Sequence, residues 1–322
     1  MKMKQIVVIL FVVLALTFPA KTSAMSAGMG PDLYISGNAS IPISIRASVE
    51  YLWGESNEYV YDTDTGDKIS ELDWELENIA MLGGVVSVGL VDWLQLNFGG
   101  WAAVTDGSGT MVDKDWTPAL SSEWDNYSIG PVKLDHGYMV DANMAFPIEI
   151  TSNLKISPML GFKFDNWKWH DKGGKYIYSV NGWRDEKGTF PDVVGIRYEQ
   201  WFYAPYLGLN MQTNYESFFF NAYIKGTLWA WSKGKDEHLN RDLLFEDKVY
   251  HQAFISAGIE AGYNVSDWCF ITLGFDYQEF MTAKGSTLST DTETGETERF
   301  DGDAAGTGHH SSVINLAVGI RF

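Results

Sequence analysis

The chain ends in residues 311–322, which read SSVINLAVGIRF. Every second residue counted back from the terminal Phe322 is apolar, as far as Ile314, whereas Arg321 and Asn315 belong to the intervening set. Because the side chains of a β-strand alternate between its two faces, one face of this segment is entirely apolar. A soluble edge strand could alternate in the same way. The aromatic end favours a lipid-facing strand of a transmembrane β-barrel.

The other end of the chain has the pattern of a secretory signal peptide. Lys2 and Lys4 precede an apolar run at residues 6–16, and Thr22 and Ala24 offer a small-residue cleavage site. This run is too short to cross a bilayer as a helix. We expect residues 1–24 to be the signal peptide, with cleavage as late as residue 27, and residues 25–322 to form one barrel domain.

The composition agrees with a barrel in an outer membrane. Aromatic residues make up 15% of the chain, with 13 Trp and 16 Tyr, as interfacial girdles require. The net charge of −19 disfavours nucleic acid as a partner and favours a cationic one. The single Cys269 excludes an intrachain disulfide and is expected on the lipid-facing side of its strand.

Alternating segments recur along the mature chain. We predict ten strands, an even number as in bacterial barrels, at residues 40–53, 67–90, 93–105, 133–149, 153–170, 195–212, 217–233, 247–264, 268–283 and 311–322. Short connections near residues 91, 151, 214 and 266 alternate with long ones at 54–66, 106–132, 171–194, 234–246 and 284–310. The pattern predicts an all-β, ten-stranded antiparallel transmembrane barrel with short periplasmic turns and long extracellular loops. Glu260, Asp276 and Arg321 would lie in its lumen and pair there.

Two short clusters carry the chemistry. Asp113 and Asp115 lie in one predicted loop, and Asp236 and His238 lie in another. Spacing of two residues in extended backbone puts both members of each pair on one face. Closure of a ten-stranded barrel would then place the two pairs opposite each other across its mouth.

Such an arrangement can activate water. Histidine titrates near neutrality and can act as a general base, and a neighbouring carboxylate orients the ring. A facing carboxylate pair can hold the same water and raise the pKa of one member. Each cluster alone is more often a solvated or Ca²⁺-binding loop. A metal site needs more ligands than the sequence offers, and we expect none, also at the loop pair His309-His310.

One parity conflict follows from the strand at 217–233. Phe218, Phe220, Ile224 and Leu228 give its even positions the lipid face, and Asp236 and His238 are also even. The dyad points inward only if the strand shifts register above the membrane. Gly234 is the position that we expect for the bulge.

The chain resembles the omptin family of outer-membrane proteases over essentially its whole mature length. The matching segments are NEYVY at 57–61, KISELDW at 68–74, MVDKDW at 111–116, GGKYIY at 173–178, Phe190-Pro191, PYLGL at 205–209 and DEH at 236–238. The resemblance implies an endopeptidase of the Gram-negative outer membrane, for which we assume a monomer. Its active site would face outward and cut cationic peptides or proteins next to basic residues.

The same resemblance assigns roles to individual residues. The catalytic aspartate pair matches Asp113 and Asp115, and the dyad matches Asp236 and His238, with water as the nucleophile and no covalent intermediate. Glu58 matches an acidic residue that receives the basic side chain before the cut, and Met111 matches a pocket-lining position. The alternative is a catalytically silent barrel that serves as an adhesin or receptor, and a general porin is a weaker one.

Three departures from the family pattern bear on specificity and activation. Gly234 stands where the family has its second pocket acid, and the acid that follows Trp124 is shifted by one position to Asp125. Omptins also need lipopolysaccharide, held by basic residues on the outer wall. Asn166, Trp201 and Tyr250 occupy the aligned positions and none is basic. We expect no cofactor other than lipopolysaccharide as an activator, whose usual binding residues are not evident here.

Overall fold

The computed structural model describes residues 41–117 and 122–322, and these residues are all-β. The predicted signal peptide lies outside them. No helix among the described residues is long and apolar enough to cross a membrane. The strands are β1 (Ile43–Tyr61), β2 (Lys68–Val91), β3 (Leu94–Ala103), β4 (Gly109–Asp115), β5 (Asn126–Ala145), β6 (Ile148–Thr151), β7 (Leu154–Lys172), β8 (Lys175–Tyr178), β9 (Glu186–Thr189), β10 (Val194–Tyr215), β11 (Phe218–His238), β12 (Leu243–Asn264), β13 (Cys269–Asp291) and β14 (Thr297–Arg321).

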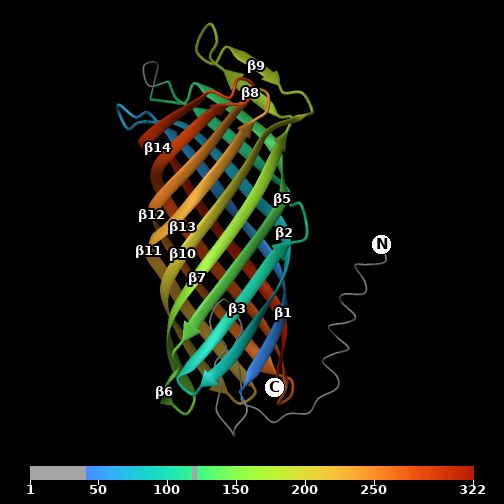
Figure 1. Cartoon of the computed structure of the whole chain (residues 1–322). Helices are drawn as coiled ribbons and strands as arrows, with labels where there is room; N and C mark the ends of the chain where they lie inside the picture. The colour runs from blue at the N-terminus through green and yellow to red at the C-terminus, as the bar shows by residue number, and fades with distance from the viewer. Residues whose placement is uncertain (1–40, 118–121) are drawn as a thin grey trace.

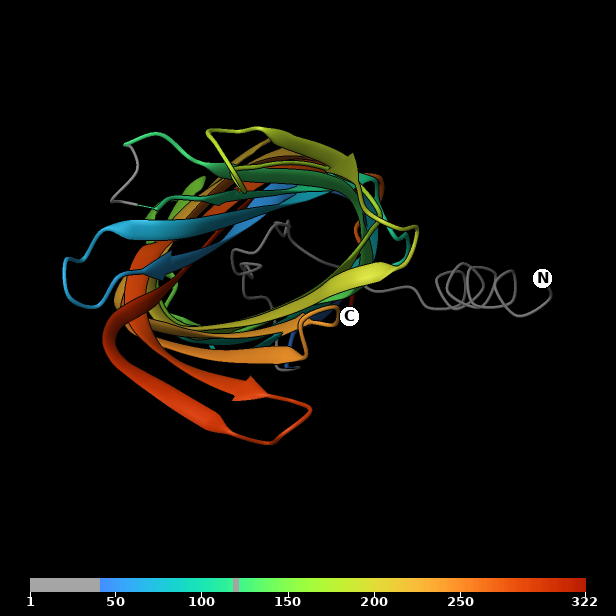
Figure 2. The ribbon, with the colours of Figure 1, turned by 90° about the horizontal axis from the view of Figure 1, so that it is seen from above.

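Antiparallel pairing closes the sheet into a barrel. The pairings run β1–β2–β3–β5–β7–β10–β11–β12–β13–β14, and β14 returns to β1. Strand β4 continues the place of β3 between β2 and β5. The barrel is tall (Figure 1), and from above it forms a flattened ring (Figure 2). The number of strands that cross the membrane stays a prediction.

The predicted long loops are mostly strand, so that part of the sequence prediction is wrong. Strand β1 continues to Tyr61, β11 to His238 and β13 to Asp291, and β4 forms within the predicted loop 106–132. Strands β8 and β9 form within loop 171–194 and lie at the end of the barrel that is uppermost in Figure 1. Above the membrane the outer face of a strand is no longer apolar, so backbone pairing continues where the hydrophobic alternation has stopped. The short turns lie close to their predicted places.

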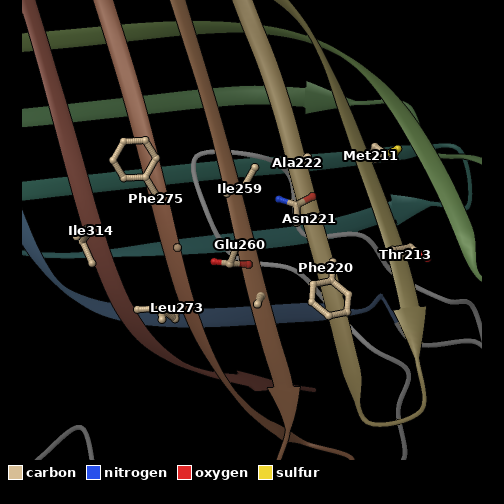
Figure 3. Close-up of a pocket in the computed structure, with 12 residues that line it drawn as sticks. Met211, Thr213, Phe220, Asn221, Ala222, Ile259, Glu260, Leu273, Phe275 and Ile314 are labelled. Atoms are coloured by element: carbon tan, nitrogen blue, oxygen red, sulfur yellow. The ribbon is translucent and has the colours of Figure 1, made fainter.

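The lower outer wall is apolar and the inner wall is polar, as the parity of the last strands predicts. Ile259, Leu273 and Val318 are exposed, whereas Ser256 and Thr272 are buried. Figure 3 shows side chains from β10 to β14, most of them apolar, that line a shallow groove. The volume of this groove is about 580 Å³. This groove belongs to the lipid-facing wall, where acyl chains fill such space.

Paired charges fill the lumen. The Nζ atoms of Lys225 and Lys163 lie 2.6 Å and 2.8 Å from carboxylate oxygens of Asp141 and Asp165, respectively. The remaining predicted lumen charges are also engaged: Glu260 lies 3.9 Å from Arg46, Asp276 accepts hydrogen bonds from Tyr223 and Asn315, and Arg321 stacks on Phe270. The lumen is therefore plugged below the open end.

An aromatic level separates the apolar wall from a charged one. Tyr203 and Trp231 stack on the outer face with ring centroids 5.2 Å apart. Beyond Trp231, β11 points Lys233 and Lys235 outward, and Lys248 is their counterpart on β12. Because lysines avoid the hydrocarbon core, residues beyond this level lie outside the membrane.

Candidate active site

Strand β11 turns the predicted dyad inward through a bulge. Leu228 and Trp229 are neighbours, and both are 70% exposed. Beyond them the even positions, from Ala230 to Asp236, face the lumen, and the pairing with β12 shifts between Thr227 and Trp231. The register shift that the parity conflict requires is therefore present. Its predicted position is wrong, because Gly234 pairs in regular register on both sides; the extra residue lies where two adjacent side chains can both face lipid.

Asp236 and His238 form a hydrogen-bonded dyad at the end of β11. Nε2 of His238 lies 2.5 Å from Oδ2 of Asp236, which is 2% exposed. Burial lowers the pKa of His238, but the charge and hydrogen bond of Asp236 outweigh burial, and the pKa is raised overall. Oδ1 of Asp236 is buried without a hydrogen-bond partner. The dyad therefore holds a basic imidazole with spare acceptor capacity beside it.

Asp113 and Asp115 lie on strand β4 rather than in a loop. Pairing with β2 and β5 fixes their backbone, and Lys114 between them faces outward, with its Nζ 3.3 Å from Asp73. Burial and the charge of Asp115 raise the pKa of Asp113 to about 8. Burial also raises the pKa of Asp115. One proton shared by this pair is the state expected at neutral pH.

The two pairs meet across the mouth of the barrel. The charges of His238 and Asp236 both act on Asp113, and Asp113 acts on His238 in turn. Among the described residues, Oδ1 of Asp113 is buried without a hydrogen-bond partner, as is Oδ1 of Asp236. Strands β4 and β11 thus bring the four predicted catalytic residues, Asp113, Asp115, Asp236 and His238, into one site.

Glu58 and Met111 lie beside this site. Glu58 is 3% exposed, and its Oε2 has no hydrogen-bond partner in the part of the chain that the structure describes. Burial raises its pKa, and the charges of Asp236, Asp247 and Asp113 raise it further. Met111 is buried on the same face of β4 as Asp113 and pairs with Trp74. Trp74 stacks on Tyr198, with 5.3 Å between the ring centroids, so an aromatic wall adjoins the acidic one.

Sequence reasoning missed two charged residues of the site. Asp247 on β12 is buried and is the cross-strand partner of Gly234. Arg241 lies in the turn after β11, and its charge lowers the pKa of both Asp113 and Asp115. Only the register of β11 and β12 reveals them, since neither belongs to a motif.

Two other sequence candidates are engaged elsewhere. Asp125 is buried, and its Oδ1 accepts a hydrogen bond from the backbone of Thr117, so it holds the chain beyond β4. The pair His309-His310 is in β14 rather than in a loop, which corrects that expectation. His309 is buried and hydrogen-bonded to Ser56, whereas His310 faces outward. Residues 41–117 and 122–322 contain no group of three or more His, Cys, Asp or Glu side chains placed to hold a metal ion.

A closed antiparallel barrel with a lipid-facing wall and an aspartate–histidine site at one mouth defines an outer-membrane enzyme. Residues 40–322 match the model of the Omptin family. The chain is 32% identical to the plasminogen activator of Yersinia pestis, over 100% of both chains. It is 28% identical to the outer membrane protease OmpP of Escherichia coli K12, over 95% of both. The crystal structure of the outer membrane protease OmpT from Escherichia coli matches with a TM-score of 0.85 and 26% identity, over 88% of this chain and 99% of that chain.

The chain therefore belongs to the omptin family. It is an endopeptidase of the outer membrane, and its fold is the transmembrane β-barrel predicted from the sequence.

Proposed function

We propose that the protein hydrolyses peptide bonds next to basic residues with a water molecule activated between the Asp113–Asp115 pair and the Asp236–His238 dyad. The observation that carries this proposal is a buried carboxylate oxygen without a hydrogen-bond partner among the described residues on each side of the mouth, Oδ1 of Asp113 and Oδ1 of Asp236. The charges of Asp236 and Asp113 both act on the imidazole of His238. A buried acceptor without a donor destabilises the folded state, so such groups point to a functional site. A water molecule or a substrate supplies the missing donors.

The chemistry follows from the protonation states. With the Nε2 hydrogen of His238 directed at Asp236, the lone pair remains on Nδ1. Nδ1 takes a proton from water as the oxygen attacks the carbonyl carbon, and Asp236 stabilises the imidazolium. The imidazolium then gives this proton to the leaving nitrogen, and the C–N bond breaks. The raised pKa of Asp113 lets the pair hold the water as both donor and acceptor.

The substrate class follows from charge. The mouth gathers the carboxylates of Asp113, Asp115, Asp236 and Glu58, and the whole chain has a net charge of −19. Such a field attracts cationic peptides and proteins to an outward-facing site. In this proposal Glu58 receives a Lys or Arg side chain, and Met111 lines the pocket. One chain contains all of these groups, so we propose that the monomer is active.

A peptide assay tests the proposal. The barrel is purified in detergent, and a fluorogenic Arg-Arg or Arg-Lys peptide is offered. Asp113→Ala and His238→Ala each lower kcat by about 100- to 10,000-fold, the usual contribution of a general base. Glu237→Gln is the matched control, because Glu237 faces outward between the dyad residues and pairs with Lys235 at 2.6 Å. Equal activity in the wild type and both alanine variants would reject the site. Absence of cleavage under every condition would favour a silent adhesin or receptor.

We further propose that lipopolysaccharide does not act through the three aligned wall positions. Asn166 is buried, with its amide hydrogen-bonded to Glu199 and to the backbone of Gln200, and Trp201 and Tyr250 carry no charge. Equal cleavage rates with and without added lipopolysaccharide support this. Stimulation that is lost in a variant lacking Lys233 and Lys248 would also agree, whereas stimulation abolished by substituting Asn166, Trp201 and Tyr250 would contradict it.

A further inference from the structure

We propose that Asp247 is a specificity-determining residue that supplies the second carboxylate of the pocket for the basic side chain, in place of the acid absent at Gly234. This inference rests on the proposed function and concerns one subsite of it. The chemical class of its ligand is the guanidinium or ammonium group of a substrate Arg or Lys.

Gly234 and Asp247 are direct cross-strand partners on β11 and β12. A Cβ atom built on Gly234 would lie 3.1 Å from Oδ2 of Asp247 and 3.4 Å from the hydroxyl of Tyr198. The carboxylate of Asp247 therefore already lies where a side chain at position 234 would begin. A side chain at position 234 would require the carboxylate of Asp247 to shift by a few tenths of an ångström, so the two positions approach the same space and one carboxylate can come from either strand.

Glu58 lies on β1, across the lumen from the Gly234–Asp247 pair. Two hydrogen bonds cross the lumen at this level. Nε2 of Gln200 donates to the carbonyl oxygen of Asn57 at 3.1 Å, and the hydroxyls of Ser232 and Thr307 lie 2.5 Å apart.

These four residues flank the two halves of the subsite. Asn57 precedes Glu58, and Thr307 is the cross-strand partner of Glu58. Gln200 is the cross-strand partner of Gly234, and Ser232 precedes Gly234 by two residues on the same inward face. The crossing bonds therefore hold the backbone of Glu58 opposite the Gly234–Asp247 pair.

Glu58 and Asp247 are 3% and 4% exposed, and within residues 41–117 and 122–322 neither forms an ion pair with a Lys or Arg. Oε2 of Glu58 also has no hydrogen-bond partner. Two buried carboxylates without a cation are unfavourable for folding. They suit a guanidinium, which binds best to two acceptors in a bidentate arrangement.

The experiment compares peptides that carry Arg, Lys or citrulline before the cut. Citrulline has the shape of Arg without the charge, so the ratio of kcat/KM for Arg to that for citrulline reports recognition of charge. Asp247→Asn lowers this ratio by about 10- to 100-fold, the usual cost of one lost hydrogen bond to a charged group. The matched control is Glu246→Gln, which removes the same charge from the outward face of β12 one residue away.

A swap variant tests the positional argument independently. Gly234→Asp combined with Asp247→Ala moves the carboxylate to β11, and the ratio stays within a few-fold of the wild type. Heat-modifiable migration in gels verifies folding of each variant. A ratio unchanged in folded Asp247→Asn overturns the inference, and so does a folded swap variant with a ratio as low as that of Asp247→Ala alone. If the wild type cleaves none of the peptides, the proposed function fails, and the role of Asp247 fails with it. Cleavage by the wild type with no preference for Arg over citrulline overturns the inference alone.

Discussion

Nε2 of His238 lies 2.5 Å from Oδ2 of Asp236 on the inner face of β11, although both residues have the parity of the lipid-facing Phe218 and Phe220. The bulge at Leu228 and Trp229 resolves this conflict, because one extra residue exchanges the two faces of a strand. The even-numbered side chains of the lower part of β11 thus face lipid, and those of the upper part face the site. The position of the dyad therefore depends on Leu228 and Trp229, which lie earlier on the same strand.

Removing the bulge is expected to abolish activity without unfolding the barrel. Deletion of Trp229 restores plain alternation, so Asp236 and His238 would face outward while residues 218–227 keep their pairing. Peptide cleavage falls below detection, and heat-modifiable migration is retained. Trp229→Ala is the control, since it keeps the bulge and removes only an outward-facing side chain. A deletion variant with wild-type cleavage would show that the dyad is not the base.

The pH dependence of cleavage follows from the pairing of His238 with Asp236. A general base must be neutral, and the pKa of His238 is raised above 6.5, since Asp236 outweighs the effect of burial. The acidic limb of the wild-type kcat/KM profile therefore lies above pH 6.5. In Asp236→Asn, burial acts without the opposing charge, and the pKa of His238 falls. Histidine NMR titration of the variant measures the shift, and an unchanged pKa would contradict the dyad.

The alternation of apolar residues sufficed to predict the membrane part of the fold. Ile314, Leu316 and Val318 are exposed and Asn315 is buried, as their parity indicates. The extent of the strands was not predictable in this way, because above the membrane no apolar face remains to mark them. Residues such as Glu55 and His310 belong to paired strands without any hydrophobic signal.

The candidate site was predictable only where its members are close in sequence. Asp236 and His238 share a strand, and so do Asp113 and Asp115, so spacing alone puts each pair on one face. Asp247 comes next to Gly234 through the register of β11 against β12, which no local pattern specifies. The bulge was inferable from parity, but its position was not, since Gly234 offered a better sequence signal than Leu228 or Trp229.

The buried ion pair between Lys225 and Asp141 is expected to support the barrel and not the chemistry. Its atoms lie 2.6 Å apart with nearly no exposure, and Tyr206 also donates to Asp141. Lys225→Met leaves a buried carboxylate without its cation and lowers the free energy of unfolding by about 3–5 kcal/mol.

Guanidinium unfolding in detergent measures this loss, and Lys225→Met with Asp141→Leu recovers most of it. The folded fraction of the single variant keeps the wild-type preference for Arg over citrulline. A loss below about 1 kcal/mol would mean that the pair contributes no more than a surface ion pair.

Removing the pocket acid Asp247 is expected to stabilise the protein at neutral and alkaline pH. Burial raises its pKa from the ordinary 3.8 to about 7. Below pH 3.8 the group is protonated in both the folded and the unfolded state and contributes no difference. Between pH 3.8 and 7 the carboxyl group of Asp247 is ionised in the unfolded chain but stays protonated in the folded chain. The free energy of unfolding therefore falls as the pH rises through this window. Above pH 7 the penalty is complete.

Asp247→Asn lacks this penalty and should unfold at a higher guanidinium concentration at pH 8, with a gain of about 1–3 kcal/mol. Near pH 3.5 the variant and the wild type should unfold together. Glu246→Gln, a change at an exposed position of the same strand, stays within about 0.5 kcal/mol of the wild type at both pH values. A variant less stable than the wild type at pH 8 would show that Asp247 holds the barrel together. Greater stability with poorer recognition of Arg would show that the acid is kept for its ligand, because a fold does not otherwise retain a buried charge that weakens it.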